Sequence, residues 1–137
     1  MNKKRGIDRS GLPSSFLASE QRKSNLILEA NLLKAREEYE AAAEKFAAAA
    51  EIEEKLVQQL VQLNRHEKAF VHLFSAVSCW AQAGDLHRAL MLGAELVSFE
   101  GILPSHQQSA QEYIEVLRSR YVQWMRSWQP QMVGTAD

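Results

Sequence analysis

The sequence predicts an all-α fold in which four to five helices pack as antiparallel helical hairpins. Neither glycine nor proline occurs between Ser14 and Ala83, so this long stretch contains no strong helix breaker. A spacing of three, four and three residues occurs twice, at Tyr39, Ala42, Phe46 and Ala49 and again at Leu86, Ala89, Gly93 and Leu96. Small residues at matched helix positions allow a neighbouring helix to approach closely, so the pattern predicts contact surfaces between stacked helices.

The composition favours a single domain and excludes several classes of function. A chain of 137 residues can bury a core without disulfides or metals, and Cys79 is its only cysteine. The 16 basic and 17 acidic residues give a net charge of −1, so the overall charge does not favour nucleic acid as a partner. No apolar run reaches the roughly 18 residues of a membrane span. Residues 1–11 lack the apolar stretch of a secretory signal, so the expected location is cytoplasmic.

The N-terminal half is expected to contain a basic arm and a long helix. Residues 1–13 are basic and have little apolar surface to bury, which predicts a flexible arm before a single helical domain over residues 14–129. One long helix is expected to end near residue 63, and the pattern leaves open whether residues 20–63 form one rod or two helices. An apolar stripe with alternating steps of four and three residues supports this helix, and only Glu53 interrupts it. The stripe consists of Leu28, Leu32, Ala35, Tyr39, Ala42, Phe46, Ala49, Leu56, Leu60 and Leu63.

A capping signal separates this long helix from the next one. Asn64 with Glu67 has the form of a capping box, in which each side chain bonds the backbone of the other residue. It predicts that a helix begins at Arg65, and Gly84 marks the end of that helix.

Two further caps divide the C-terminal part of the chain. Asp85 is expected to cap a helix over residues 86–99, and Gly101 marks its end. Ser105 with Gln108 is a second capping box, which predicts a capping helix over residues 105–129. Residues 130–137 begin with Pro130 and are expected to be disordered.

Residues 69–100 resemble a tetratricopeptide-repeat unit, most specifically in the run Ala83-Gly84-Asp85-Leu86-His87-Arg88-Ala89 and at Leu73, Ala76 and Trp80. Residues 23–50 resemble the same unit through Tyr39, Ala42, Phe46 and Ala49, but the glycine of the family's turn is replaced by Glu37. Tyr39 and Leu86 are 47 residues apart, whereas the family repeats at 34, so the resemblance implies a lengthened second helix. It implies repeat-like units over residues 23–63 and 65–100, followed by the capping helix.

The resemblance also implies a concave surface, lined by the first helix of each unit, that binds a peptide. On this chain the surface would carry Ser24, Ile27, Asn31, Lys34, Val71, Phe74, Ser78 and Gln82. A subgroup of the family clamps a terminal carboxylate with a lysine and an asparagine four residues apart. Asn31 matches that asparagine, but Ile27 stands where the lysine belongs, so the sequence departs from the carboxylate clamp.

The sequence contains little that indicates a cofactor, a metal or a catalytic group. No glutamate is followed three residues later by a histidine, so the paired motif of carboxylate-bridged metal bundles is missing. The dispersed histidines are interpreted as surface residues, and Cys79 is interpreted as a small buried apolar residue. There is no glycine-rich phosphate loop, so neither a cofactor nor a metal is expected.

One enzymatic alternative rests on Arg65 and His72. Their Arg-x6-His spacing is similar to the motif of helical HEPN ribonucleases, which cleave RNA without a metal. This chain lacks the polar residue that usually follows the arginine, and it has no basic surplus for RNA. A structural coiled-coil oligomer is a second alternative.

Arginines and aromatic residues interleave near the C-terminus, at Arg118, Arg120, Tyr121, Trp124, Arg126 and Trp128. We interpret these aromatics as closing the end of the helical stack, and if they are left uncovered they would be a hot spot for a partner helix or for self-association. The favoured function is a non-catalytic adaptor or scaffold that binds a peptide or helix of a partner protein, or another copy of itself, in a helical groove. The candidate contacts are Ile27, Asn31, Lys34, Val71, Phe74, Ser78, Gln82, Trp124 and Trp128.

Overall fold

The computed structural model describes residues 11–136, with side chains described as far as Trp128. This part of the chain forms five α-helices and no strand, which confirms the predicted all-α fold. The helices are α2 (Ser14–Ala35), α3 (Tyr39–Gln62), α4 (His66–Gln82), α5 (Leu86–Val97) and α6 (Pro104–Ala136).

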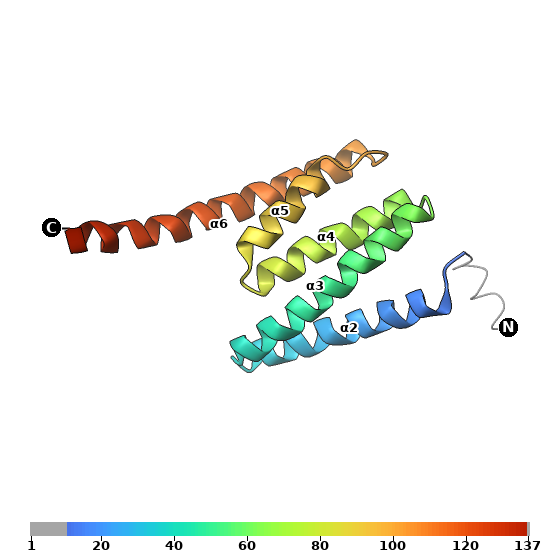
Figure 1. The fold of residues 1–137 in the computed structure, drawn as a ribbon, viewed down its shortest axis with the longest axis horizontal. Helices are drawn as coiled ribbons and strands as arrows, with labels where there is room; N and C mark the ends of the chain where they lie inside the picture. The colour runs from blue at the N-terminus through green and yellow to red at the C-terminus, as the bar shows by residue number, and fades with distance from the viewer. Residues whose placement is uncertain (1–10, 137) are drawn as a thin grey trace.

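The helices are stacked in the order in which they occur in the chain (Figure 1). Each helix packs against the next, so that α2 and α6 lie at opposite ends of the array and α4 lies in the middle. The C-terminal part of α6 extends past the N-terminal end of α5 (Figure 1). Long-range packing in this fold therefore consists of neighbouring hairpins, as in other helical stacks.

The three hairpin turns between α2 and α5 share one geometry. A residue with positive φ follows the end of each helix, and these residues are Glu37 (63°), Asn64 (58°) and Gly84 (87°). In each turn the next residue's backbone N–H bonds a carbonyl five residues earlier, at 2.8 to 3.0 Å, which is the Schellman helix ending. The turn at Glu37 settles the question left open by the sequence, because residues 20–63 form two helices and the second of them, α3, ends at Gln62.

Two of the predicted helix caps are wrong and one is confirmed, although each of these helices begins within one residue of its predicted start. Asn64 does not cap α4, because its positive φ makes it part of the ending of α3, and among the described residues no side-chain hydrogen bond caps the start of α4. Asp85 caps α5 as expected, since its Oδ1 accepts a hydrogen bond from the backbone N–H of Arg88 at 3.0 Å. The last helix begins at Pro104 and not after a Ser105 cap. The backbone N–H of the first helical residue has no partner within the helix, so a proline, which lacks this N–H, is favoured at that position.

The repeated three-four-three pattern supplies much of the core. Six of its eight residues are buried, Leu86 is half-buried and Tyr39 is exposed. Gly93 shows why the pattern needs a small residue, since a Cβ at this position would lie 2.4 Å from Cδ1 of Ile114. The absence of a side chain at Gly93 therefore lets α5 and α6 approach closely.

Both ends of the domain differ from the predicted boundaries. Residues 1–10 of the expected basic arm lie outside the described residues, but Leu12 packs against a cluster around Phe16, so packed structure begins inside the predicted arm. The last helix does not end at residue 129 before a disordered tail but continues through Pro130 to Ala136. Pro130 has no backbone N–H to donate to the carbonyl of Arg126, four residues earlier. Because Arg126 is exposed, water can donate to this carbonyl instead.

Candidate binding surfaces

A groove between α4 and α6 contains two of the predicted contact residues. It has a volume of about 370 Å³ and is lined by Phe70, Val71, Phe74, Ser75, His106 and Ser109. Val71 is 63 % exposed, whereas Phe70 is buried and Phe74 is half-buried. An exposed apolar wall over a buried aromatic floor is typical of sites that bind an apolar side chain of a ligand.

Aromatic contacts hold the floor of this groove in place. The Phe70 ring meets the rings of Phe74 and Phe99 edge-on, with centroids 6.1 and 6.0 Å apart, and it stacks on His106 at 6.4 Å. On the α6 side, the Phe74 and Tyr113 centroids are 5.3 Å apart. Such contacts restrict ring rotation, so the groove is formed before any ligand binds.

The structure does not bring all predicted groove residues together. Ser78 and Gln82 lie farther along α4 and do not line the hollow. On α2, Ile27 packs against the core, while Asn31 and Lys34 are exposed away from the groove. The second wall comes instead from α6.

The two α6 residues of the groove, His106 and Ser109, were missed by the sequence reasoning. They are three residues apart, and Tyr113 follows four residues later, so they share one face of a helix. Extending the α6 periodicity toward its N-terminus could have found this face, but not which helix lies opposite it.

An apolar stripe on α6 is only partly covered by α5. It runs at steps of four and three through the buried Ala110, Ile114 and Leu117, and then through the half-buried Tyr121. It continues to Trp124 and Trp128, which are 53 % and 52 % exposed. The predicted closure of the stack by these tryptophans therefore does not occur within the described residues.

A second hollow lies where the cover by α5 ends. It has a volume of about 310 Å³ and is lined by residues 84–85 of the turn before α5, by residues 86–87 at the start of α5, and by Tyr121 and Trp124. The Tyr121 and Trp124 rings stack with centroids 5.9 Å apart, and Trp128 meets Trp124 edge-on at 6.1 Å. The three aromatics thus form one continuous surface that starts at this hollow.

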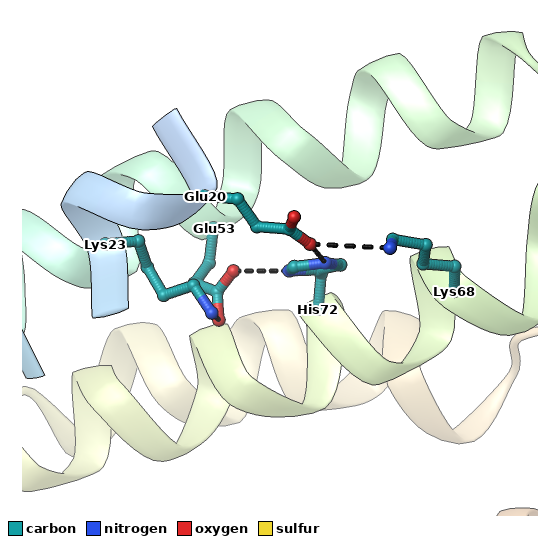
Figure 2. Close-up of polar contacts among 5 residues, drawn as sticks. All are labelled: Glu20, Lys23, Glu53, Lys68 and His72. Atoms are coloured by element: carbon teal, nitrogen blue, oxygen red, sulfur yellow. Dashed lines mark hydrogen bonds and ion pairs between the residues drawn. The ribbon is translucent and has the colours of Figure 1, made fainter. Parts of the chain in front are cut away.

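A polar cluster between α2, α3 and α4 surrounds the buried His72 (Figure 2). His72 Nδ1 lies 2.6 Å from Oε1 of Glu53, and Nε2 lies 3.1 Å from Oε2 of Glu20. Lys23 Nζ lies 3.6 Å from Oε2 of Glu53, and Lys68 Nζ lies 3.5 Å from Oε2 of Glu20. Both ring nitrogens face carboxylate oxygens, and both can donate only when the ring carries two protons.

This cluster changes the interpretation of two residues. Glu53, which interrupts the apolar stripe of the sequence, is fully buried, and its Oε2 accepts no hydrogen bond within the described part of the chain. His72 is buried as well, so the prediction that the histidines lie on the surface is wrong for this one. A charged group can occupy such a core position only because an opposite charge is supplied by a neighbouring helix.

The arrangement around His72 does not favour the ribonuclease alternative. A catalytic histidine must reach the substrate with one ring nitrogen, but both nitrogens of His72 are held by carboxylates. Two acidic neighbours would also repel an RNA phosphate. Arg65, the other residue of that alternative, is half-buried at the N-terminal end of α4.

Cys79 and the potential metal ligands of the described residues can be compared with reactive thiols and metal sites. Burial, and secondarily the negative charge of Glu53, raises the pKa of the Cys79 thiol to about 11, so the thiol is not an activated nucleophile. No group of three potential ligands in residues 11–136 is placed to hold a metal ion. Cys79 is buried, in agreement with its predicted role as a small apolar residue.

Comparisons with protein families, curated proteins and solved structures found no match for this chain. Among the helices described, none combines the length and the apolar character that crossing a bilayer requires.

Proposed function

We propose that this protein is a non-catalytic adaptor that binds a peptide or helix of a partner protein in the groove between α4 and α6. The observation that carries the proposal is the exposed Val71 beside the aromatic floor of Phe70 and Phe74. Such a groove gains binding energy by burying an apolar side chain, and its rigid walls reduce the entropy lost on binding.

The chemistry of the groove supports binding without turnover. Its polar lining consists of Ser75, His106 and Ser109, and the His106 ring is stacked on Phe70. The buried charged groups lie on the other side of α4, where they connect helices to each other. The resemblance of residues 69–100 to a tetratricopeptide-repeat unit leads to the same expectation, since helices at the corresponding place line the peptide groove in that family.

The proposal can be tested with two matched variants. Val71→Glu places a charge on the groove wall, and Met91→Glu places the same charge on α5 outside the groove, at a residue that is 62 % exposed compared with 63 % for Val71. Peptides selected from a displayed library on the folded protein would be measured against both variants by calorimetry. Val71→Glu is expected to weaken binding by about tenfold or more, and Met91→Glu is expected to leave it within about twofold.

Nuclear magnetic resonance provides an independent readout of the same binding. Amide shifts on adding the selected peptide are expected to cluster at Phe74, His106 and Ser109, because these residues lie along the groove. Equal loss of affinity in the two variants, or shifts confined to other helices, would contradict the proposal. Both variants should retain the helical circular dichroism of the parent, since both sites are exposed.

A further inference from the structure

The uncovered half of α6 is a surface separate from the groove. The helix α5 has 12 residues and α6 has 33, so their lengths are about 18 and 50 Å and most of α6 extends past its partner. The apolar stripe does not stop where α5 starts at Leu86, but continues through Trp124 to Trp128. Since the stripe already packs against a helix along Ile114 and Leu117, its continuation has the spacing needed to pack against another helix.

The charges that α6 itself carries along the exposed stripe all have one sign. Residues 116–128 contain Arg118, Arg120 and Arg126 and no acidic residue. Arg118 Nη1 donates a hydrogen bond of 3.0 Å to Oε1 of Glu115, which lies one turn closer to the part of α6 that α5 covers. Arg120 is four residues before Trp124 and Arg118 is three residues before Tyr121, so these two arginines border the stripe, whereas Arg126 lies on the opposite face of the helix. A partner that lies along the stripe therefore meets a basic border at Arg118 and Arg120.

We propose that this part of α6 binds an amphipathic helix of another protein whose apolar stripe is bordered by acidic residues. The partner helix would lie along α6 beyond the start of α5, with one large apolar side chain in the hollow between Leu86, Tyr121 and Trp124. Its apolar face would cover Trp124 and Trp128, and its acidic residues would lie near Arg118 and Arg120, which are on the two sides of the stripe.

A second copy of this chain does not fit the surface equally well. If the same segment of two copies paired, arginines would meet arginines, which opposes association. Five of the 17 acidic residues lie on α3, more than on any other described helix. The apolar face of α3 is already buried in the core through Ala42, Phe46, Ala49 and Leu56. The like charges of two α6 helices and the burial of the apolar face of α3 thus favour an acidic helix from a different protein.

The shape of the site also favours a helix over a bilayer surface. A helix that binds an anionic bilayer needs its whole apolar face open to a flat surface. Here residues 84–87, in the turn before α5 and at the start of α5, stand beside Tyr121 and Trp124 and form the wall of the hollow. A flat anionic surface would meet that wall before it reached the start of the stripe.

The test uses the full chain and two designed helical peptides with fluorescent labels. Both peptides have the same leucine stripe at heptad spacing, and the residues that border the stripe are glutamates in one and lysines in the other. Binding is measured by anisotropy for the parent and for a Trp124→Ala/Trp128→Ala variant. Leu28→Ala/Leu32→Ala is the matched control, because these α2 residues are 61 % and 52 % exposed and lie at the opposite end of the array.

We expect the glutamate peptide to bind about tenfold or more tightly than the lysine peptide, and the difference to shrink at high salt. The tryptophan variant should weaken binding of the glutamate peptide by about tenfold or more, while the α2 variant leaves it unchanged. The Val71→Glu variant should also bind the glutamate peptide normally, which separates this surface from the groove.

Three results would overturn the inference. The first is equal or tighter binding of the lysine peptide. The second is a dimer in analytical ultracentrifugation that the tryptophan variant abolishes, which would assign the surface to a second copy. The third is binding to vesicles of phosphatidylserine and phosphatidylcholine that is lost in the tryptophan variant, which would assign it to a membrane. Each of these results leaves the groove proposal standing, because that proposal is tested by Val71.

Discussion

Replacing His72 by leucine should destabilise the protein strongly, although leucine suits a buried helix position. The substitution removes the group that lies 2.6 Å from the fully buried carboxylate of Glu53. The other oxygen of Glu53 accepts no hydrogen bond from the described residues, so Lys23, whose Nζ lies 3.6 Å from that oxygen, would be the remaining ion-pair partner in this part of the chain. Breaking a buried pair in this way costs about 3 to 5 kcal/mol.

The size of this loss can be judged against the whole fold. Domains of this kind have free energies of unfolding of about 5 to 15 kcal/mol, so His72→Leu removes a large share of the total. At about 3 °C per kcal/mol the melting temperature should fall by roughly 10 to 15 °C. Urea unfolding followed by circular dichroism measures the free energy directly, and His87→Leu, at an exposed histidine, should change it by less than about 0.5 kcal/mol.

A double variant tests the physical reason for this loss. Glu53→Leu combined with His72→Leu removes the buried charge together with its partner, so it should be at least about 2 kcal/mol more stable than His72→Leu alone. Glu20 and Lys23 remain, and both are partly exposed and can be solvated. The reasoning is refuted if His72→Leu costs less than about 1 kcal/mol, or if the double variant is no more stable than the single one.

Three further predictions follow from the turns, the α5–α6 contact and the thiol. Glu37→Gly should raise the free energy of unfolding by about 0.5 to 1 kcal/mol, because φ is positive at this residue. Glu38→Gly, at a φ of −92°, should lower the free energy of unfolding. A lower free energy of unfolding for Glu37→Gly would contradict this interpretation of the turn. Gly93→Ala should lower the free energy of unfolding, measured in urea, by about 1 to 3 kcal/mol. Adding Ile114→Val should restore part of that free energy, because it removes the methyl group that the new Cβ would overlap. If the double variant is no more stable than Gly93→Ala, the close contact is contradicted. Because the pKa of Cys79 is raised from 9.0 to about 11, iodoacetamide at pH 8 should alkylate the folded protein at least about 100-fold more slowly than the urea-unfolded one, as followed by mass spectrometry, and similar rates would refute the burial of this thiol.

The raised thiol pKa also fixes the sign of one pH dependence. The folded state holds the thiol proton more tightly than the unfolded state, so this contribution to stability is complete below pH 9. It is lost as the pH rises toward 11. A Cys79→Ala variant should therefore lose less stability than the parent between these two values.

The sequence predicted the helices well because their apolar positions repeat locally. Ala42, Phe46 and Ala49 lie on one face of α3, and burial of that face depends only on spacing within one helix. The turns were harder to predict. Glu37 is a good helix former, so its positive φ has no local signal, and Asn64 is favoured both before a helix start and after a helix end.

The buried polar cluster could not be predicted from local spacing. Glu53 and His72 are 19 residues apart, and His72 and Glu20 are 52 apart, on three different helices. A single acidic residue in an apolar stripe is equally compatible with a helix that turns its stripe toward solvent. The same reason explains which residues of the groove were predicted. Val71 and Phe74 share one helix face and were predicted from local spacing, whereas His106 and Ser109 come from another helix and were missed.

The sequential stacking of the helices also determines how the molecule should come apart. Side chains of α2, α3 and α4 are tied to one another by Glu20, Glu53 and His72, whereas α6 packs mainly on the short α5. Detachment of α6 would thus leave the N-terminal three-helix unit intact, and amide hydrogens should exchange with solvent sooner in α6 than in α3. A partner that holds α6 in place would slow this exchange at the C-terminal end and leave the rest of the protein unchanged.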